Sequence, residues 1–269
     1  MSYQTVFQRY ELKYILTNAQ KNKLLKQMDG RMMPDPYGES TVRSLYYDTD
    51  TYRLARHSIE KPVYKEKLRI RCYDTVLPTD TVFVELKKKY DSVVYKRRLP
   101  LSEQEAARWM AGGSCPTKGQ IADEISYFYN YYETLHPVVF LSYDRQAFYS
   151  EENADFRISF DENIQSRLDA LSLTEEPGGE RILDHGYVLM ELKTAGGLPL
   201  WLVQFLTENG LYKRSFSKYG TAYERQIFPY TAAGRLCSIA YSAPAPLLSS
   251  EKKGYGRSTY ERKEGMVYA

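Results

Sequence analysis

Strict alternation of charged and apolar side chains runs through several short segments of the chain and predicts two-sided β-strands. In one of them Lys67, Arg69 and Arg71 alternate with apolar residues at positions 68, 70 and 72. Side chains at i and i+2 of a strand share a face, so all three cations point to the same side. The segments 82–89 and 156–161 alternate in the same way. We therefore expect a sheet with one charged face and one apolar face.

Three Glu-Leu-Lys triplets, at 11–13, 85–87 and 191–193, repeat this pattern. Each triplet puts a carboxylate and an ammonium group on one face and its leucine on the other. A half-solvated sheet explains any single strand of this kind. Several such strands in succession favour a closed barrel with a polar interior. The sequence thus predicts an α+β fold, a closed tunnel-like barrel of about eight antiparallel strands with a polar, basic lumen and helices packed outside.

Strand parity assigns many more cations than carboxylates to this lumen. The expected lining is Arg9, Lys13, Arg43, Lys67, Arg69, Arg71, Lys87, Lys89, Lys96, Arg98, Arg145, Arg157 and Lys193 with Glu11, Glu85, Asp161 and Glu191. Unpaired charge in a low-dielectric site costs several kcal/mol per ion. The lumen therefore requires a polyanion or water.

Changes of period predict the other elements. Helices are expected at 17–28, 102–110, 121–135 and 198–207, with a last helix capped by Ser217. Strands are expected near 41–48, 62–74, 81–90, 93–100, 138–149, 154–161 and 186–194. We expect one domain over 1–242, because composition changes only near residue 243, and a disordered basic tail over 243–269.

Charge and cysteine usage narrow the class of protein. The net charge is only +3, so the basic character is local. This low net charge argues against general, sequence-independent binding of nucleic acid. Cys72, Cys115 and Cys237 are odd in number and far apart, which excludes a disulfide framework or a Cys-x-x-Cys zinc site. An apolar signal segment and a stretch of roughly 18 to 20 apolar residues are also missing. We expect a cytoplasmic protein.

Common catalytic motifs are absent from the sequence. We find no Gly-x-x-x-x-Gly-Lys loop, no Gly-x-Gly-x-x-Gly turn, no His-Glu-x-x-His pair and no plausible Ser/His/Asp set. The charged residues instead suit phosphate, since arginine binds phosphate oxygens bidentately, lysine supplies point charge, and carboxylates hold divalent metals. Phosphoryl transfer needs mainly positioning, charge neutralisation and a metal. The tunnel is therefore a candidate active site.

Eight short motifs carry a family resemblance over most of the chain up to about residue 225. They are Phe7-Gln8-Arg9-Tyr10-Glu11-Leu12-Lys13-Tyr14, Ser44-Leu45-Tyr46-Tyr47-Asp48, Lys67-Leu68-Arg69-Ile70-Arg71-Cys72-Tyr73, Glu85-Leu86-Lys87, Ser142-Tyr143-Asp144-Arg145, Arg157-Ile158-Ser159-Phe160-Asp161, Glu191-Leu192-Lys193 and Ser215-Phe216-Ser217-Lys218-Tyr219. In their order and number they resemble the catalytic domain of the vacuolar transporter chaperone (VTC) polyphosphate polymerases, within the triphosphate tunnel metalloenzyme (CYTH-like) superfamily.

The resemblance implies a tunnel that binds a nucleoside triphosphate and inorganic polyphosphate. ATP would donate its γ-phosphate to the chain end, with a divalent metal, manganese rather than magnesium, as cofactor. The catalytic residues would be Arg69, Arg71, Lys87, Arg145 and Glu191. Substrate would be bound by Lys13, Lys67, Lys96, Arg98, Tyr143, Arg157, Lys193, Ser217 and Lys218. The metal ligands would be Glu191 and Glu11, although Glu11 and Glu85 also suit a role as ion-pair partners of nearby bases.

One departure from the superfamily bears on the reaction. Its Glu-x-Glu-x-Lys signature is matched only in part, because Arg9 stands where the first carboxylate is expected. Fewer carboxylates and more cations favour holding a long polyanion over activating water. A triphosphatase acting on tripolyphosphate or nucleoside triphosphates and a non-catalytic polyphosphate-binding module remain alternatives. A separate membrane protein is a possible partner.

Overall fold

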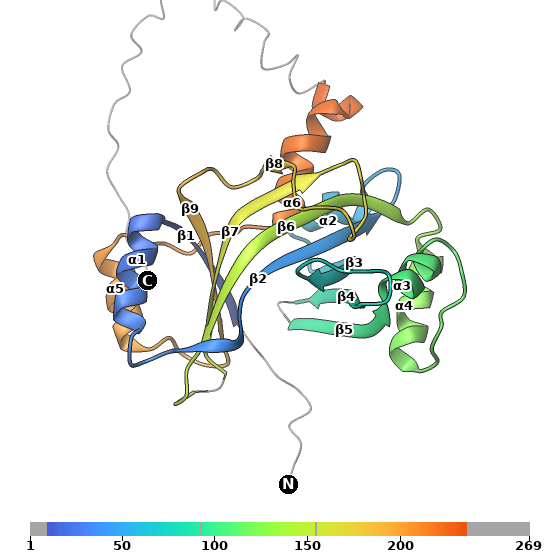
Figure 1. The fold of residues 1–269 in the computed structure, drawn as a ribbon. Helices are drawn as coiled ribbons and strands as arrows, with labels where there is room; N and C mark the ends of the chain where they lie inside the picture. Colours follow the sequence, from blue (N-terminus) through green and yellow to red (C-terminus); the bar gives the residue numbers. More distant parts are fainter. Residues whose placement is uncertain (1–9, 92, 154, 236–269) are drawn as a thin grey trace, which may run out of the picture.

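The computed structural model describes residues 10–91, 93–153 and 155–235, which form an antiparallel sheet flanked by helices (Figure 1). The strands are β1 (Tyr10–Thr17), β2 (Met33–Asp48), β3 (Tyr64–Tyr73), β4 (Thr81–Tyr90), β5 (Val93–Ser102), β6 (His136–Tyr149), β7 (Arg157–Arg167), β8 (Glu180–Arg181) and β9 (Tyr187–Thr194). The helices are α1 (Asn18–Met28), α2 (Arg53–Ile59), α3 (Glu103–Met110), α4 (Gln120–Tyr131), α5 (Leu200–Glu208) and α6 (Lys218–Ala222). A π-helix (Tyr223–Ile227) and a 3-10 helix (Phe228–Tyr230) follow α6. Arg9 and the predicted tail lie outside the described residues.

Eight strands pair in the order β1-β9-β7-β6-β2-β3-β4-β5, and β8 pairs with β7. Every pairing is antiparallel, so the predicted α+β architecture is confirmed. In the described part of the chain β1 and β5 are the two ends of this hydrogen-bonded path. An ion pair between Lys87 of β4 and Glu11 of β1, 3.7 Å apart, connects the two sides of the sheet. A side-chain ion pair, and not backbone hydrogen bonding, thus connects β1 to the β3–β5 side of the sheet.

Apolar side chains cover the outer face of the sheet at two places. Leu68 and Leu86 pack with Trp109 of α3 against the β3–β4 side, while Phe160 packs with Phe205 of α5 on the β7–β9 side. Figure 1 shows α3 and α4 beside β3, β4 and β5, and α1 and α5 beside β1 and β9. Burying each large apolar side chain contributes about 1.5–3 kcal/mol. This packing fixes which side of each strand faces the helices and leaves the charged side facing inward.

A third apolar cluster closes part of the inner face. Tyr219 of α6 and Tyr223 of the π-helix pack against Leu141, Ile164 and Leu189, which belong to β6, β7 and β9. Residues further along the same strands are charged and lie on the same face. The charged tunnel is therefore bounded on one side by the helical segment that follows β9.

Local signals predicted several elements correctly and missed others. Thr17 and Ser102 form capping boxes at the starts of α1 and α3, as their sequences indicate. Helix α2 was not predicted; it follows Tyr52, whose φ of 54° is a left-handed backbone value. Strand β7 continues past Asn163, where φ is 49°, and ends at Arg167 instead of 161. No helix in residues 10–235 as described has the length and apolar character needed to cross a membrane.

Candidate functional site

The register of the sheet brings most of the predicted site residues to one face. Residues directly opposite each other in an antiparallel pair have neighbouring side chains on the same side. The opposed pairs are Glu11 with Lys193, Lys13 with Glu191, Lys67 with Lys87, Arg69 with Glu85, Glu85 with Arg98, Lys87 with Lys96, and Arg145 with Asp161. The inner face thus gathers cations from β1, β3, β4, β5, β6 and β9.

Asp161 and Glu191 form a buried carboxylate cluster at the middle of this face. Asp161, which is 0% exposed, accepts hydrogen bonds from Arg145 Nε at 2.6 Å and Nη2 at 2.7 Å. Lys218 Nζ lies 2.5 Å from Asp161 and 3.1 Å from Glu191. Glu191 also lies 3.2 Å from Arg145 Nη2 and 3.2 Å from Lys13 Nζ. Two carboxylates therefore orient three cations.

These contacts set the charge states of the cluster. Burial by itself would raise the pKa of Glu191, but Lys218, Lys13 and Arg145 hold that pKa well below its usual value. Burial likewise disfavours the charged form of Lys218, yet Asp161 and Glu191 raise its pKa. For Glu11, Lys87 and Lys13 outweigh burial and lower the pKa to about 2. Glu191 and Glu11 are therefore ionised at neutral pH, and so is Lys218.

Glu85 forms a second carboxylate centre on the β3–β5 side. Its side chain is 1% exposed and lies 2.7 Å from Arg69 Nη2, 2.7 Å from Lys96 Nζ and 2.6 Å from Arg98 Nη2. Burial raises the pKa of Glu85, and Arg69 and Arg71 lower it further than burial raises it, so the net shift is downward. The expected ion-pair role of Glu85 thus agrees with the geometry, and Lys96 and Arg98 face the tunnel as the strand parity predicted.

Arg71 lies on the same face and, within the described part of the chain, donates no hydrogen bond to a carboxylate. It is 7% exposed, and its guanidinium donates to Ser44 Oγ at 3.3 Å and to the Tyr143 hydroxyl at 3.1 Å. Tyr143 is also close to Lys218, whose Nζ lies 4.4 Å from the ring centroid. Because both partners of Arg71 are neutral hydroxyls, these contacts hold its guanidinium in place without neutralising its charge.

The segment that leads into α6 lies across the tunnel and contacts β1 and β3. Ser217 caps α6 by accepting a hydrogen bond from Gly220 N, as predicted, and its Oγ also accepts one from Lys67 Nζ at 2.9 Å. Lys13 Nζ donates to Phe216 O at 3.0 Å, and the Lys13 carbonyl accepts from Arg214 N. Ser217 and Lys218 therefore lie beside Lys13 and Lys67, which were predicted to bind substrate together with them.

Arg157 and Lys193 share the inner face but lie toward its edge. They are directly opposed in the β7–β9 pair, and Arg157 is exposed at the first residue of its strand. Burial lowers the pKa of Lys193, and the charge of Arg145 lowers it further. The structure thus places these two cations on the predicted face, at one end of the cluster.

Arg43 is the one described residue of the expected lining that the structure contradicts. It shares the outer face with Leu45 and Tyr47, and its guanidinium donates to Glu175 O at 3.0 Å and to Thr75 Oγ1 at 2.9 Å. Strand β2 turns the opposite set of residues inward, including Ser44 and Tyr46. The assignment failed because the motif 44–48 is polar and aromatic on both faces, so alternation alone did not fix its orientation.

Glu191 and Glu11 are the residues that could hold a divalent metal. Both contact Lys13, whose Nζ is 3.2 Å from an oxygen of each. Among the described residues no group of three or more His, Cys, Asp or Glu suits a metal ion. Magnesium-type sites commonly use one or two carboxylates together with substrate phosphates. The pair therefore fits a metal that is held jointly with a phosphate ligand.

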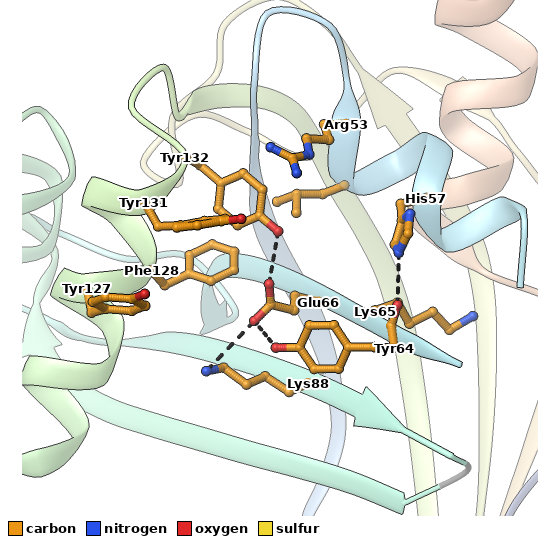
Figure 2. Close-up of a pocket in the computed structure, with 11 residues that line it drawn as sticks. Arg53, His57, Tyr64, Lys65, Glu66, Lys88, Tyr127, Phe128, Tyr131 and Tyr132 are labelled. Carbon is orange, nitrogen blue, oxygen red and sulfur yellow. Dashed lines mark hydrogen bonds and ion pairs between the residues drawn. The ribbon is translucent and has the colours of Figure 1, made fainter. Parts of the chain in front are cut away.

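A cavity of about 420 Å³ lies mainly against the outer face of β3 and β4, and Lys65 also contributes to its lining (Figure 2). Its lining includes Arg53 of α2, Glu66 of β3 and three tyrosines of the α4 segment. Glu66 accepts hydrogen bonds from the hydroxyls of Tyr64 and Tyr132 and lies 3.7 Å from Lys88 Nζ. The carboxylate is thus already paired, and the cavity is separate from the candidate active site.

Sequence reasoning undervalued some residues that organise the tunnel. Asp161 was assigned to the lining but not to the site, although its position two residues beyond Ser159 on the charged face was visible. Tyr46 was noted only within a motif; its hydroxyl accepts from Arg69 Nη1 at 2.9 Å, and its ring stacks on Tyr219. These contacts join segments far apart in the chain, so no local pattern predicts them.

Comparisons with known proteins place this arrangement in a family. A search of curated proteins found no match. The solved structure of a putative adenylate cyclase from Bacillus halodurans is similar in fold, with a TM-score of 0.50 and 15% identity, covering 82% of this chain and 97% of that one. The putative adenylyl cyclase HpAC1 from Hippeastrum has a TM-score of 0.52 and 17% identity, covering 81% of this chain and 97% of that one. The model of the VTC domain matches residues 8–227, so the chain belongs to the VTC domain family.

Proposed function

We propose that the chain is a metal-dependent polyphosphate polymerase that transfers the γ-phosphate of ATP to a growing polyphosphate chain inside the tunnel. The observation that carries the proposal is the enclosed inner face, where cations from six strands and α6 share a few carboxylates. Such a face matches a ligand with many closely spaced negative charges. Membership of the VTC family supports phosphoryl-transfer chemistry.

The chain's own residues would act by binding and alignment. Arg69, Arg71, Lys87 and Arg145 would bind phosphate oxygens and hold the acceptor chain end in line with the γ-phosphorus. A terminal oxygen of the acceptor would then form a bond to that phosphorus while the bond to the bridging oxygen of ADP breaks, and ADP leaves. Neutralising the charge on the phosphate oxygens supplies most of the catalysis in this kind of transfer.

Glu191, together with Glu11, would hold the metal, with manganese preferred over magnesium. A divalent metal held by these carboxylates would supply positive charge that neutralises the phosphate oxygens. Lys13 contacts both carboxylates, so it would keep them in place for the metal and itself bind phosphate. On this proposal, movement of the polymer across a membrane would need a separate membrane protein.

A triphosphatase is the second candidate function. The structure of HpAC1 is described as revealing a dominant triphosphatase activity, and the fold of this chain is similar to it. In that reaction water would replace the polyphosphate end as the attacking group. The two reactions use the same phosphate clamp, so the products distinguish them.

The test is incubation of the purified chain with ATP and manganese, with ADP and phosphate quantified and polymer sized on a gel. Polymer formed with one ADP per added unit supports the polymerase. Free phosphate without polymer refutes it and supports the triphosphatase. Glu191→Gln should abolish turnover, whereas Glu162→Gln, which removes an outer-face carboxylate paired with Lys21 at 2.6 Å, should not. Tight polyphosphate binding with no turnover in the unmodified protein would mean a binding module.

A further inference from the structure

Two pairs of lysines lie directly opposite each other on the inner face of β3 and β4. Lys67 is opposite Lys87, and Lys65 is opposite Lys89. Like charges placed directly opposite in an antiparallel sheet are destabilising. Four ammonium groups therefore lie close together on the inner side of β3 and β4. This arrangement favours an anionic ligand.

The contacts of these lysines do little to neutralise their charge. Lys67 Nζ donates to Ser217 Oγ at 2.9 Å, and Lys65 Nζ donates to the Ser58 carbonyl at 3.1 Å. Both acceptors are neutral. Lys87 lies 3.7 Å from Glu11, which it shares with Lys13. Burial lowers the pKa of Lys65, and repulsion from Lys89 and Lys87 lowers it further.

The Lys65 and Lys89 pair lies at the end of the tunnel. The next pair along the strands is Tyr64 with Tyr90, which are 41% and 57% exposed. On the β6–β9 side the apolar cluster around Tyr219 covers the inner face. Figure 2 shows that the Lys65 side chain leaves β3 in a direction away from Glu66, although Lys65 also contributes to the lining of the outer cavity. A linear ligand that leaves the clamp in this direction would therefore pass over the lysine pairs.

We propose that Lys65 and Lys89 extend the phosphate clamp into an exit track for a linear polyanion, specifically inorganic polyphosphate too long to be held by the clamp alone. The proposal rests on the proposed function, because it assumes that polyphosphate occupies the tunnel. Residues two apart on a strand are separated by about 7 Å, so this pair adds one further contact beyond Lys67 and Lys87. A triphosphate held by the central arginines would end before it.

The experiment compares ligands of two lengths on one double variant. Lys65→Gln/Lys89→Gln and the unmodified protein are titrated by calorimetry with long-chain polyphosphate and with tripolyphosphate at constant ionic strength. Affinity for the long chain should fall about tenfold, as expected for the loss of charge-assisted contacts. The fold-loss in affinity for tripolyphosphate should be at least about fivefold smaller than the fold-loss for the long chain. The reason is that tripolyphosphate does not reach this lysine pair and so loses no contact with it. Thermal unfolding of the variant confirms that it is folded.

Lys23→Gln/Lys26→Gln on α1 is the matched control, because it removes the same charge from exposed positions. Equal losses for both ligands, no loss for the long chain, or an equal loss in the control would each overturn the exit track. The comparison measures binding only. Failure of the unmodified protein to make polymer from ATP would refute the polymerase but would leave the chain-length ratio measurable.

Discussion

Replacing Asp161 with asparagine tests whether the tunnel is a cluster of cations organised by a few carboxylates. Asp161 is fully buried and contacts Arg145 at 2.6 Å and Lys218 at 2.5 Å. Removing one partner from a buried ion pair costs roughly 3–5 kcal/mol, because the remaining charge is left without compensation. For a domain of this size that corresponds to a decrease in Tm of roughly 6–20 °C.

The assay is thermal unfolding with and without saturating tripolyphosphate. Asp161→Asn leaves the inner face one unit more positive, so phosphate should neutralise charge that the carboxylate no longer balances. A ligand that binds the folded state stabilises it in proportion to the logarithm of its affinity. We therefore expect the difference in Tm between the variant and the unmodified protein to shrink when tripolyphosphate is added.

Asp144→Asn is the control. Asp144 is exposed on the outer face of β6 and accepts hydrogen bonds from Thr41 and Asn163. The Asp144→Asn substitution removes one negative charge, as Asp161→Asn does, but from the outer face and not from the tunnel. A decrease in Tm for Asp161→Asn no larger than that of Asp144→Asn would refute the reasoning. The reasoning would also be refuted if tripolyphosphate left the difference in Tm between Asp161→Asn and the unmodified protein unchanged.

Two further predictions concern Arg71 and Lys67. Arg71→Gln should weaken tripolyphosphate binding about 10- to 100-fold in calorimetry. Arg43→Gln is the control on the outer face and should change the affinity less than about twofold. Equal losses of affinity in the two variants would contradict the observed orientation of β2. Burial and the charge of Lys87 lower the pKa of Lys67 to about 7. A bound polyanion favours its charged form, so binding takes up a proton and affinity should fall as pH rises above 7. Lys67→Met should lose this part of the pH dependence; an identical pH profile would contradict it.

Much of the site was predictable because strand parity is a local property. Once Leu68 and Leu86 are taken as core, Lys67, Arg69 and Lys87 must point to the opposite side. The same reasoning failed at Arg43, where aromatic and polar residues occupy both faces of β2. Burial against helices decides orientation, and for β2 that information lies in contacts with distant segments.

Other parts of the site depend on long-range contacts that no sequence window contains. Lys218 reaches Asp161 and Glu191 because α6 follows a segment that lies across the sheet, anchored by Lys13 and Lys67. Helix α2 was missed for a related reason. Its cap is the side chain of Asp48, which accepts from Leu54 N and Ala55 N six and seven residues later and also from the Tyr219 hydroxyl.

The number of carboxylates in the tunnel balances two opposing requirements. Glu85 serves three cations, and Asp161 and Glu191 together serve three more. If every cation had its own carboxylate, a phosphate group would have to compete with a complete ion pair and its binding energy would be small. With no carboxylates, repulsion among buried cations would oppose folding. Sharing keeps each cation oriented but only partly neutralised, so phosphate binding and folding stability are coupled through the same three carboxylates.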